Sequence, residues 1–442
     1  MFTNDGWSAA KNPPLYIVPE SWYSSPFQDV MPKFYQAWNE VKAMTNGEGV
    51  NWAWAQLLRV SAMQRLTDTY GPIPYSKVSS TDLYVTYDSQ EDVYKHMFED
   101  LNNAIEVLTD YAVANPSATP MAAYDNVYNG DFTKWVKYAN SLKVRILMRQ
   151  SAKKDVSADI AAIFNNAQEY PVFTSIDDQA TLVYNNTVDF YKWYIQPKNL
   201  PSDGSGVIFG DNFRVSEAIV DALQTKDDPR LPVYVAPTKH SFEAHRANAS
   251  VPFVYRGQPA GLSAAEQNEI DKDDYSVLSS TIRSESRAFV MTFAELQFLK
   301  AEAIIRGMIT GNAADEYAKG IRASMQKWAA ISSDDVDVYL ARPDVALNTA
   351  QNEALKQIGT QAWIDSFLNG FEAFANWRRT GYPELKVGTS VSSAIPVRYI
   401  YSDNEQNNPN LISWTNEKIG RMVNETDMVW FQPQKWNTNV NR

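Results

Sequence analysis

Apolar residues recur at helical spacing over most of the chain, and the stripes predict helices that follow one another in pairs. Phe34, Trp38 and Val41 form the first stripe, at i, i+4, i+7 spacing. The same spacing predicts helices at about 30–45, 51–69, 89–110, 131–151, 215–225, 292–307, 314–329 and 349–369, with a short one ending near Arg379. Four pairs result: 30–45 with 51–69, 89–110 with 131–151, 292–307 with 314–329, and 349–369 with the shorter partner.

Long stretches between the helices lose this period. Residues 1–28 carry four prolines, residues 171–289 contain only one clear helix and some β-like pieces such as Val233-Tyr234-Val235, and residues 385–442 read mostly as loop. The predicted fold class is therefore mostly α, with four irregular tetratricopeptide-like helix pairs (30–151 and 292–380) packed against a long irregular insertion. We expect a single domain over residues 1–442. Small residues mark where the third pair crosses closely: Ala294, Ala301 and Gly320.

Charged residues on apolar helix faces are unexpected and therefore informative. Arg145 and Arg149 lie one turn apart, and Arg149 continues an apolar stripe; Glu302 shares a side with apolar neighbours. A buried charge needs a partner. We predict that Arg145 or Arg149 pairs with an acid of the 292–307 helix or its neighbours, in a structural rather than catalytic role.

Composition excludes several classes of protein. Forty Lys and Arg against 52 Asp and Glu give a net charge of −12, which argues against binding nucleic acid through overall charge. The absence of cysteine excludes disulfides, thiolate zinc sites and cysteine nucleophiles. The first residues do not resemble a signal peptide. Aromatic residues reach 13% of the chain, and aromatic rings serve both as core and as flat ligand platforms.

A search for reactive motifs finds no catalytic signature, and we expect no enzyme activity, metal or cofactor. His240 and His245 flank Glu243 in a stretch interpreted as a polar loop, where solvated side chains are a better interpretation than a metal site. The acidic runs 271–274 and 334–337 lack the pattern of a calcium loop and are interpreted as solvated charge. A glycosidase would need two carboxylates facing one bond, and no motif indicates such a pair.

Several blocks, taken in order, resemble one family. They are Asn140-Ser141-Leu142-Lys143-Val144-Arg145-Ile146-Leu147-Met148-Arg149, Asp228-Pro229-Arg230-Leu231, Met291-Thr292-Phe293-Ala294-Glu295 with Ala301-Glu302-Ala303, Gln361-Ala362-Trp363-Ile364 with Asn369-Gly370-Phe371-Glu372, Arg378-Arg379-Thr380-Gly381-Tyr382-Pro383, and Ile395-Pro396-Val397-Arg398-Tyr399-Ile400-Tyr401 followed by Glu405 and Asn408. Tyr70-Gly71-Pro72-Ile73-Pro74-Tyr75 fits as well. This set, over roughly residues 30–410, is similar to the SusD/RagB family, in particular its SusD-like branch of outer-membrane nutrient-binding lipoproteins of Bacteroidetes.

The resemblance implies a fold of four tetratricopeptide-like helix pairs beside a more irregular part. It implies a cell-surface protein that binds nutrients without catalysis and works with a SusC-like TonB-dependent transporter. Many members bind glycans, and the RagB branch is associated with peptides. A lipid anchor on a cysteine is also implied; that cysteine and a signal peptide are absent here, so we expect them before Met1.

Binding residues vary in this family, so candidates come from aromatic residues in loops. These are Trp22, Tyr23, Trp193, Tyr194 and Tyr255, with the neighbouring Arg256. Sugar rings stack on aromatic faces while their hydroxyls bind polar side chains. The leading hypothesis is oligosaccharide binding. The alternatives are peptide capture of the RagB kind and a helical-repeat scaffold that contacts only proteins.

Overall fold

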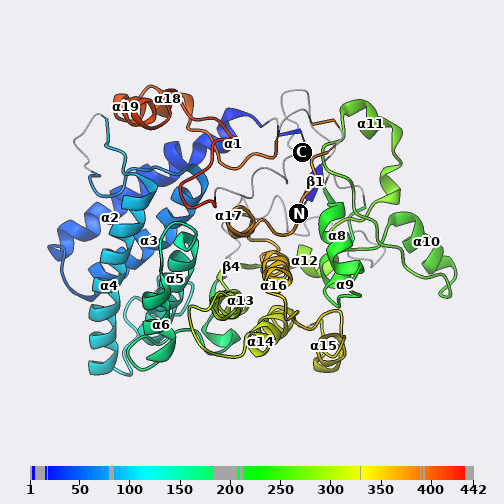
Figure 1. Cartoon of the computed structure of the whole chain (residues 1–442), viewed down its shortest axis with the longest axis horizontal. Coiled ribbons are helices and arrows are strands. Elements are labelled where there is room, and N and C mark those ends of the chain that lie inside the picture. The colour runs from blue at the N-terminus through cyan, green and yellow to red at the C-terminus, as the bar shows by residue number, and fades with distance from the viewer. Residues whose placement is uncertain are drawn as a thin grey trace.

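Helices dominate the computed structural model of the chain (Figure 1). It describes residues 2–4, 15–16, 18–78, 84–183, 207–209, 213–328, 330–388, 390–391 and 394–433. The N-terminal half supplies one group of packed helices: α2 (Met31–Thr45), α3 (Gly49–Tyr70), α4 (Gln90–Ala114), α5 (Phe132–Gln150) and α6 (Ser157–Asn165). Helix α3 contacts α2 and α4, and α4 contacts α5. The largest apolar core lies among these helices.

The second group of helices follows the insertion. It consists of α13 (Phe293–Ile305), α14 (Ala313–Gln326), α15 (Ser333–Leu340), α16 (Gln351–Asp365) and α17 (Gly370–Thr380). Helix α13 contacts α14 and α16, and α16 contacts α17. The two groups meet where α13 contacts α5 and α17 contacts α3. The mostly helical fold class and the four predicted helix pairings are confirmed.

Local sequence explains where these helices begin and how closely they pack. Helix α4 starts at Ser89, whose side chain accepts a hydrogen bond from the Asp92 amide at 3.1 Å. Its stripe of apolar residues is buried, as predicted: Val93, Met97, Leu101, Ile105 and Leu108. Gly320 of α14 crosses α13 so closely that a Cβ there would lie 2.6 Å from a ring carbon of Phe298. The prediction of a tight crossing at Gly320 is therefore confirmed.

The segment predicted as an irregular insertion contains more regular structure than its composition indicates. It carries η3 (Ile176–Asp178), β2 (Ala180–Val183), β3 (Phe213–Val215), α8 (Glu217–Gln224), α9 (Leu231–Tyr234), α10 (Lys239–Ala247), α11 (Ala264–Glu269), η4 (Lys272–Asp274), α12 (Ser280–Arg283) and β4 (Arg287–Met291). Strand β2 pairs antiparallel with β4, and β3 with β1 (Phe2–Asn4). Val233 and Tyr234, predicted to be β-like, lie in α9, so that prediction is wrong. Pro232 at the second position of that short helix favours a helical start.

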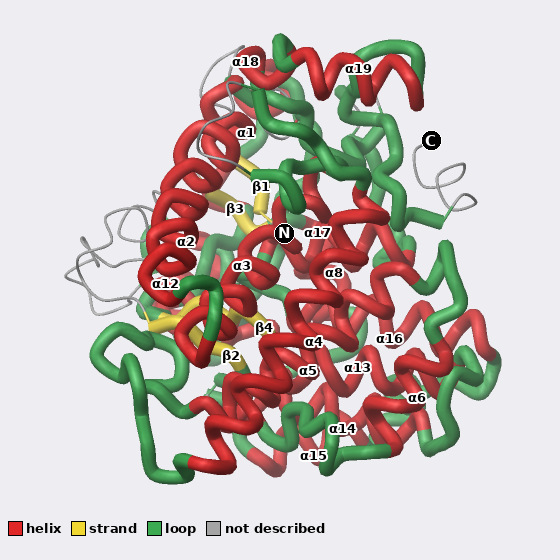
Figure 2. Tube along the Cα trace, turned by 90° about the vertical axis from the view of Figure 1, so that its left-hand side faces the viewer, coloured by secondary structure: helices red, strands yellow, loops and turns green. Residues whose placement is uncertain are grey.

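The two ends of the chain are also more ordered than predicted. The irregular start contains α1 (Glu20–Ser25) and the π-helical turn η2 (Pro26–Val30), and the C-terminal segment contains α18 (Asp403–Gln406) and α19 (Pro409–Lys418). These elements lie close together at the top of the molecule in Figures 1 and 2. Phe431, beyond α19, is fully buried in the first core, 5.6 Å from the guanidinium of Arg149. Long-range packing therefore fixes a segment that has no periodic pattern.

A buried ionic network joins the two groups of helices. Arg145 of α5 forms a bidentate ion pair with Glu295 of α13, with N–O distances of 2.5 and 2.6 Å. Arg149, one turn later, contacts both oxygens of Glu372 of α17 at 2.6 and 2.7 Å and Asp68 of α3 at 3.1 Å. All five side chains are buried. The predicted pairing of the two arginines is confirmed, and Arg149 extends it to α17.

A second bidentate ion pair closes the contact between α13 and α17, within the second group of helices. Arg379 of α17 contacts the two oxygens of Glu302 of α13 at 2.6 and 2.7 Å. Burial alone would raise the pKa of Glu302, but Arg379 and Arg306 reverse the shift and lower this pKa to about 2. Burial likewise opposes ionisation of Glu372, yet Arg149 and Arg145 hold its pKa below the ordinary value. Both carboxylates are therefore charged at neutral pH, and their charge belongs to the interface.

Removing one partner of the network should lower the free energy of unfolding far more than removing a surface charge. We expect Arg149→Met to lower the free energy of unfolding by about 3–5 kcal/mol, because Glu372 and Asp68 would keep buried, uncompensated charge. The measurement is urea unfolding followed by circular dichroism.

The matched control is Arg322→Met, which breaks the exposed pair between Arg322 and Asp337 on α14 and α15. That change should stay within about 0.5 kcal/mol. An equally small effect for Arg149→Met would show that the buried network does not hold the two helix groups together.

Candidate ligand-binding surface

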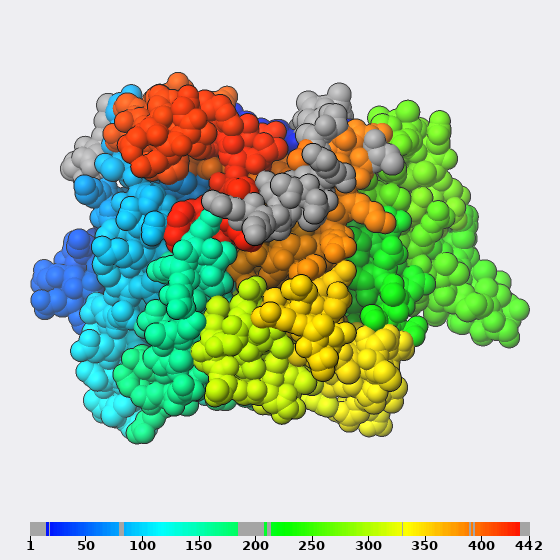
Figure 3. All heavy atoms as spheres, viewed as in Figure 1, coloured from blue at the N-terminus to red at the C-terminus, as the bar shows by residue number. Residues whose placement is uncertain are grey.

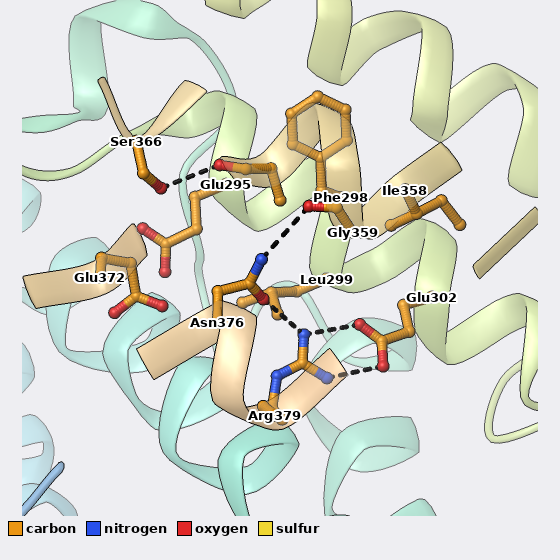
Figure 4. A pocket seen from close by; sticks show the side chains of 11 residues that line it. Glu295, Phe298, Leu299, Glu302, Ile358, Gly359, Ser366, Glu372, Asn376 and Arg379 are labelled. Carbon is orange, nitrogen blue, oxygen red and sulfur yellow. Dashed lines mark hydrogen bonds and ion pairs between the residues drawn. The ribbon is translucent and has the colours of Figure 1, made fainter. Parts of the chain in front are cut away.

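Charged side chains surround a small cavity between α13, α16 and α17 (Figure 4). Glu295, Glu302 and Glu372 line it together with Asn376 and Arg379. Asn376 donates to the carbonyl oxygen of Gly359 and accepts from Arg379 at 2.9 Å. The cavity volume is about 10 Å³, enough for roughly one water molecule. A sugar ring does not fit, and the acids already bind arginines, so this cavity serves the structure.

An exposed aromatic pair lies instead on α1. The side chain of Trp22 is 40% exposed, and Tyr23 beside it is half-buried. The carbonyl oxygen of Tyr23 accepts a hydrogen bond from the hydroxyl of the buried Tyr70 at the end of α3. The backbone of α1 is thereby fixed to the helix groups below it.

A second set of rings is linked to Tyr70 through Tyr399. Tyr399 is 41% exposed, and its ring meets the edge of Tyr70 at 5.8 Å between centroids. Phe374 of α17 lies 6.4 Å from Tyr399, and Phe371, one turn earlier, is 45% exposed. We call Trp22, Tyr23, Tyr399, Phe374 and Phe371 the aromatic ledge. Its members come from α1, from the segment before α18 and from α17.

Two of the sequence blocks that carry the family resemblance, 70–75 and 395–401, meet and determine the position of Tyr399. Gly71 ends α3 with a positive φ of 85°, and the chain then turns through Pro72. The buried Arg398 donates to the carbonyl oxygen of Tyr70, and the hydroxyl of Tyr401 donates to the carbonyl oxygen of Pro72 at 2.7 Å. The Tyr399 amide donates to Thr69 at 3.0 Å. Tyr399 is therefore held outward between two buried anchors.

The polar groups beside the ledge are mainly hydrogen-bond acceptors. Glu20 of α1 accepts from the Asp403 amide at 3.0 Å. Burial, followed by the charges of Asp403 and Glu20, raises the pKa of the Tyr23 hydroxyl. That hydroxyl therefore remains protonated at neutral pH and can donate. Flat rings bordered by carboxylates and a hydroxyl donor suit a ligand with an apolar face and neutral hydroxyl groups.

The other predicted candidates lie elsewhere. Trp193 and Tyr194 fall outside the described residues. Tyr255 is half-buried and packs against the second apolar core. Arg256 is exposed and stacks over Tyr275 at 4.9 Å. Both lie in the insertion, whose helices are far from α1 in Figure 1. The structure thus brings Trp22 and Tyr23 to the ledge but does not bring Tyr255 and Arg256 to it.

The acidic run of the insertion forms a small surface cluster with a histidine. Donor atoms of His240, Asp271 and Asp274 lie within 4.8 Å of one another, a spacing that could hold a metal ion. His245, which the sequence places near His240, instead meets the carbonyl oxygen of Val251 at 2.6 Å. Each aspartate of the run also faces its own cation: His240 with Asp271 at 2.9 Å, Lys239 with Asp273 at 2.6 Å and Arg256 with Asp274 at 4.0 Å. These pairs compensate the charge locally and account for the cluster.

Sequence reasoning missed three of the five residues of the ledge. Phe371 and Tyr399 lie within blocks that carry the family resemblance, and those blocks were interpreted as structural. Phe374 continues the face of Phe371 at i+3 spacing, which resembles an ordinary buried stripe. The spacing itself cannot tell an exposed face from a buried one, so no sequence signal distinguished these rings.

Residues 4–402 match a family described as starch-binding and associating with the outer membrane. The chain therefore belongs to the SusD-like family of outer-membrane-associated proteins. No curated protein matches the chain. Within the described residues, none of the helices combines the length and apolar character needed to cross a membrane.

Several solved structures share the whole fold. A SusD homologue from Bacteroides uniformis has a TM-score of 0.80 at 27% identity, covering 98% of this chain and 92% of that one. A chitin-binding SusD homologue from Flavobacterium johnsoniae has a TM-score of 0.79 at 26% identity, covering 99% and 92%. A homologue from Bacteroides thetaiotaomicron has a TM-score of 0.77 at 26% identity, covering 98% and 92%.

The pair of His240 and Asp271 gives the insertion a pH-dependent contact that can be measured. The hydrogen bond that His240 donates to the Asp271 carboxylate raises the pKa of His240. Its contribution to stability is present below the ordinary histidine pKa of about 6.5 and is lost as pH rises through the raised value.

We expect Asp271→Asn to lower the pKa of His240 toward the ordinary value, as read from the pH dependence of its imidazole NMR signals. The signals of His96 and His245 serve as internal references. An unchanged titration of His240 in Asp271→Asn would mean that the pair does not form in solution.

Proposed function

We propose that this protein captures oligosaccharides at the outer-membrane surface through the aromatic ledge and delivers them to a SusC-like TonB-dependent transporter. In this proposal the protein performs no catalysis, and a lipid anchor of the kind found in its family holds it at the membrane. The observation that carries the proposal is the ledge itself. Trp22, Tyr399 and Phe371 are exposed on three separate elements, which are connected through contacts of Tyr70 and Phe374.

The chemistry of the ledge favours sugars over other nutrients. A pyranose ring has an apolar face that stacks on aromatic rings and a rim of hydroxyls that need polar partners. Tyr23, Glu20 and Asp403 place such partners beside the rings. The protein as a whole is acidic, with a net charge of −12, which disfavours strongly anionic polysaccharides. Neutral oligosaccharides are therefore the proposed ligands.

The family and the solved relatives point in the same direction. The family is described as starch-binding, and the Flavobacterium johnsoniae homologue is a chitin-binding protein. Starch and chitin are both neutral polymers of hexopyranose units. These relatives support a neutral glycan as the ligand class of this chain and make α-glucan and chitin fragments the first ligands to test.

The test is calorimetric titration of the whole chain with maltohexaose, cellohexaose and chitohexaose, with a tryptic peptide digest alongside. We expect saturable binding of at least one hexasaccharide. Trp22→Ala and Tyr399→Ala should each weaken it about 5- to 10-fold, because a stacked ring contributes roughly 1 kcal/mol. Tyr124→Ala is the control, since Tyr124 is an exposed tyrosine in the connection between α4 and α5, outside the ledge.

Three outcomes would contradict the proposal in different ways. Binding of the peptide digest alone would indicate a RagB-like peptide carrier. Glycan binding that is indifferent to Trp22 and Tyr399 would move the site away from the ledge. Binding of neither ligand class would favour a scaffold that contacts only proteins.

A further inference from the structure

A small polar notch opens beside the Phe371 end of the ledge, between α3 and α17. Gln64, Arg65, Asp68, Arg145, Asn369, Phe371 and Glu372 line it. Phe371 and the half-buried Arg65 lie at its mouth, whereas Gln64, Asp68 and Arg145 are buried. The volume is about 10 Å³, close to that of one water molecule. The notch therefore admits one small polar group from a ligand that lies on Phe371.

The floor of the notch is held rigidly. The amide of Gln64 donates to Asp68 at 2.6 Å, and its carbonyl oxygen accepts from Arg145 at 3.4 Å. Arg145 is fixed in turn by its ion pair with Glu295, and Glu372 by its ion pair with Arg149. Asn369 is held by its bond to the carbonyl oxygen of Phe289 at 3.0 Å. A ligand group that enters the notch meets polar atoms whose positions are already set by the buried network.

The charges of the notch identify the kind of group that fits. It carries two arginines, Arg65 and Arg145, and two carboxylates, Asp68 and Glu372. The signs balance, so neither an anion nor a cation gains from entering. Gln64 and Asn369 each use one amide hydrogen within the fold, and an amide carries a second hydrogen that can be donated. A neutral hydroxyl, which donates and accepts and has the size of water, matches this lining.

We propose that the notch is a subsite for the primary hydroxyl of a neutral hexopyranose unit whose apolar face lies on Phe371. This inference rests on the proposed glycan-binding function and adds a specificity to it: hexoses with a free primary hydroxyl are preferred over sugars that lack this group. The ring stacks on the exposed face of Phe371, and the hydroxymethyl group reaches past the edge of the ring into the polar notch.

The experiment compares the tightest-binding hexasaccharide among maltohexaose, cellohexaose and chitohexaose with its 6-deoxy derivative, in which hydrogen replaces each primary hydroxyl. Calorimetry on the whole chain should show at least about tenfold weaker binding of the derivative, because the derivative lacks the hydroxyl that would form hydrogen bonds in the notch. Phe371→Ala should weaken the parent sugar and bring the ratio of the two affinities close to one. Phe371→Tyr keeps the ring and should retain the ratio.

The outcomes separate this inference from the function on which it rests. Equal binding of the parent and the 6-deoxy sugar, or an unchanged ratio in Phe371→Ala, would overturn the subsite while leaving glycan binding intact. Binding of none of the three hexasaccharides would overturn both. Thermal unfolding of each variant, monitored by circular dichroism, shows that a changed ratio does not come from misfolding.

Discussion

The structure depends on a set of buried ion pairs that tie one half of the chain to the other. Arg145 and Arg149 of α5 reach across to Glu295 of α13 and Glu372 of α17. Arg379 and Glu302 then pair α17 with α13 inside the second half. Such pairs stabilise a fold only when every charge has its partner, because an isolated charge in the interior is very unfavourable. The network therefore fixes the relative position of the two helix groups, and through α17 it fixes the place of Phe371 and Phe374.

The blocks that carry the family resemblance have a common physical meaning in this fold. Most of them contribute a member of the buried network or of a similar contact: Arg230 pairs with Asp228 in the interior and also reaches Gln361 at 2.6 Å. The block around Tyr399 is anchored by Arg398 and Tyr401 on the turn after α3. These residues are constrained by polar geometry as well as by packing. Tyr399, which lies outside the helices, therefore has a well-defined position in the ledge.

Helical periodicity made most of the long helices predictable, and the position of Arg149 on an apolar stripe made its burial predictable. The short helices of the insertion were not predictable, because α9 and α12 have four residues each and are fixed by contacts distant in sequence. The ledge was predictable only in part. Trp22 stood out in a loop-like segment, whereas Tyr399 and Phe371 were hidden among residues with structural roles. The exposure of a side chain depends on the whole fold, so it cannot be predicted from the local sequence pattern.

The most direct test of the account is hydrogen–deuterium exchange of the whole chain, with and without a saturating oligosaccharide that binds it. The account predicts slower exchange in three segments that are distant in sequence: residues 20–25 of α1, residues 369–375 at the start of α17 and residues 398–403. All three carry or border the ledge, and α17 also carries the network residue Glu372. Protection confined to residues 231–289, in the insertion around Tyr255 and Arg256, would contradict the account and place ligand binding on the other side of the molecule.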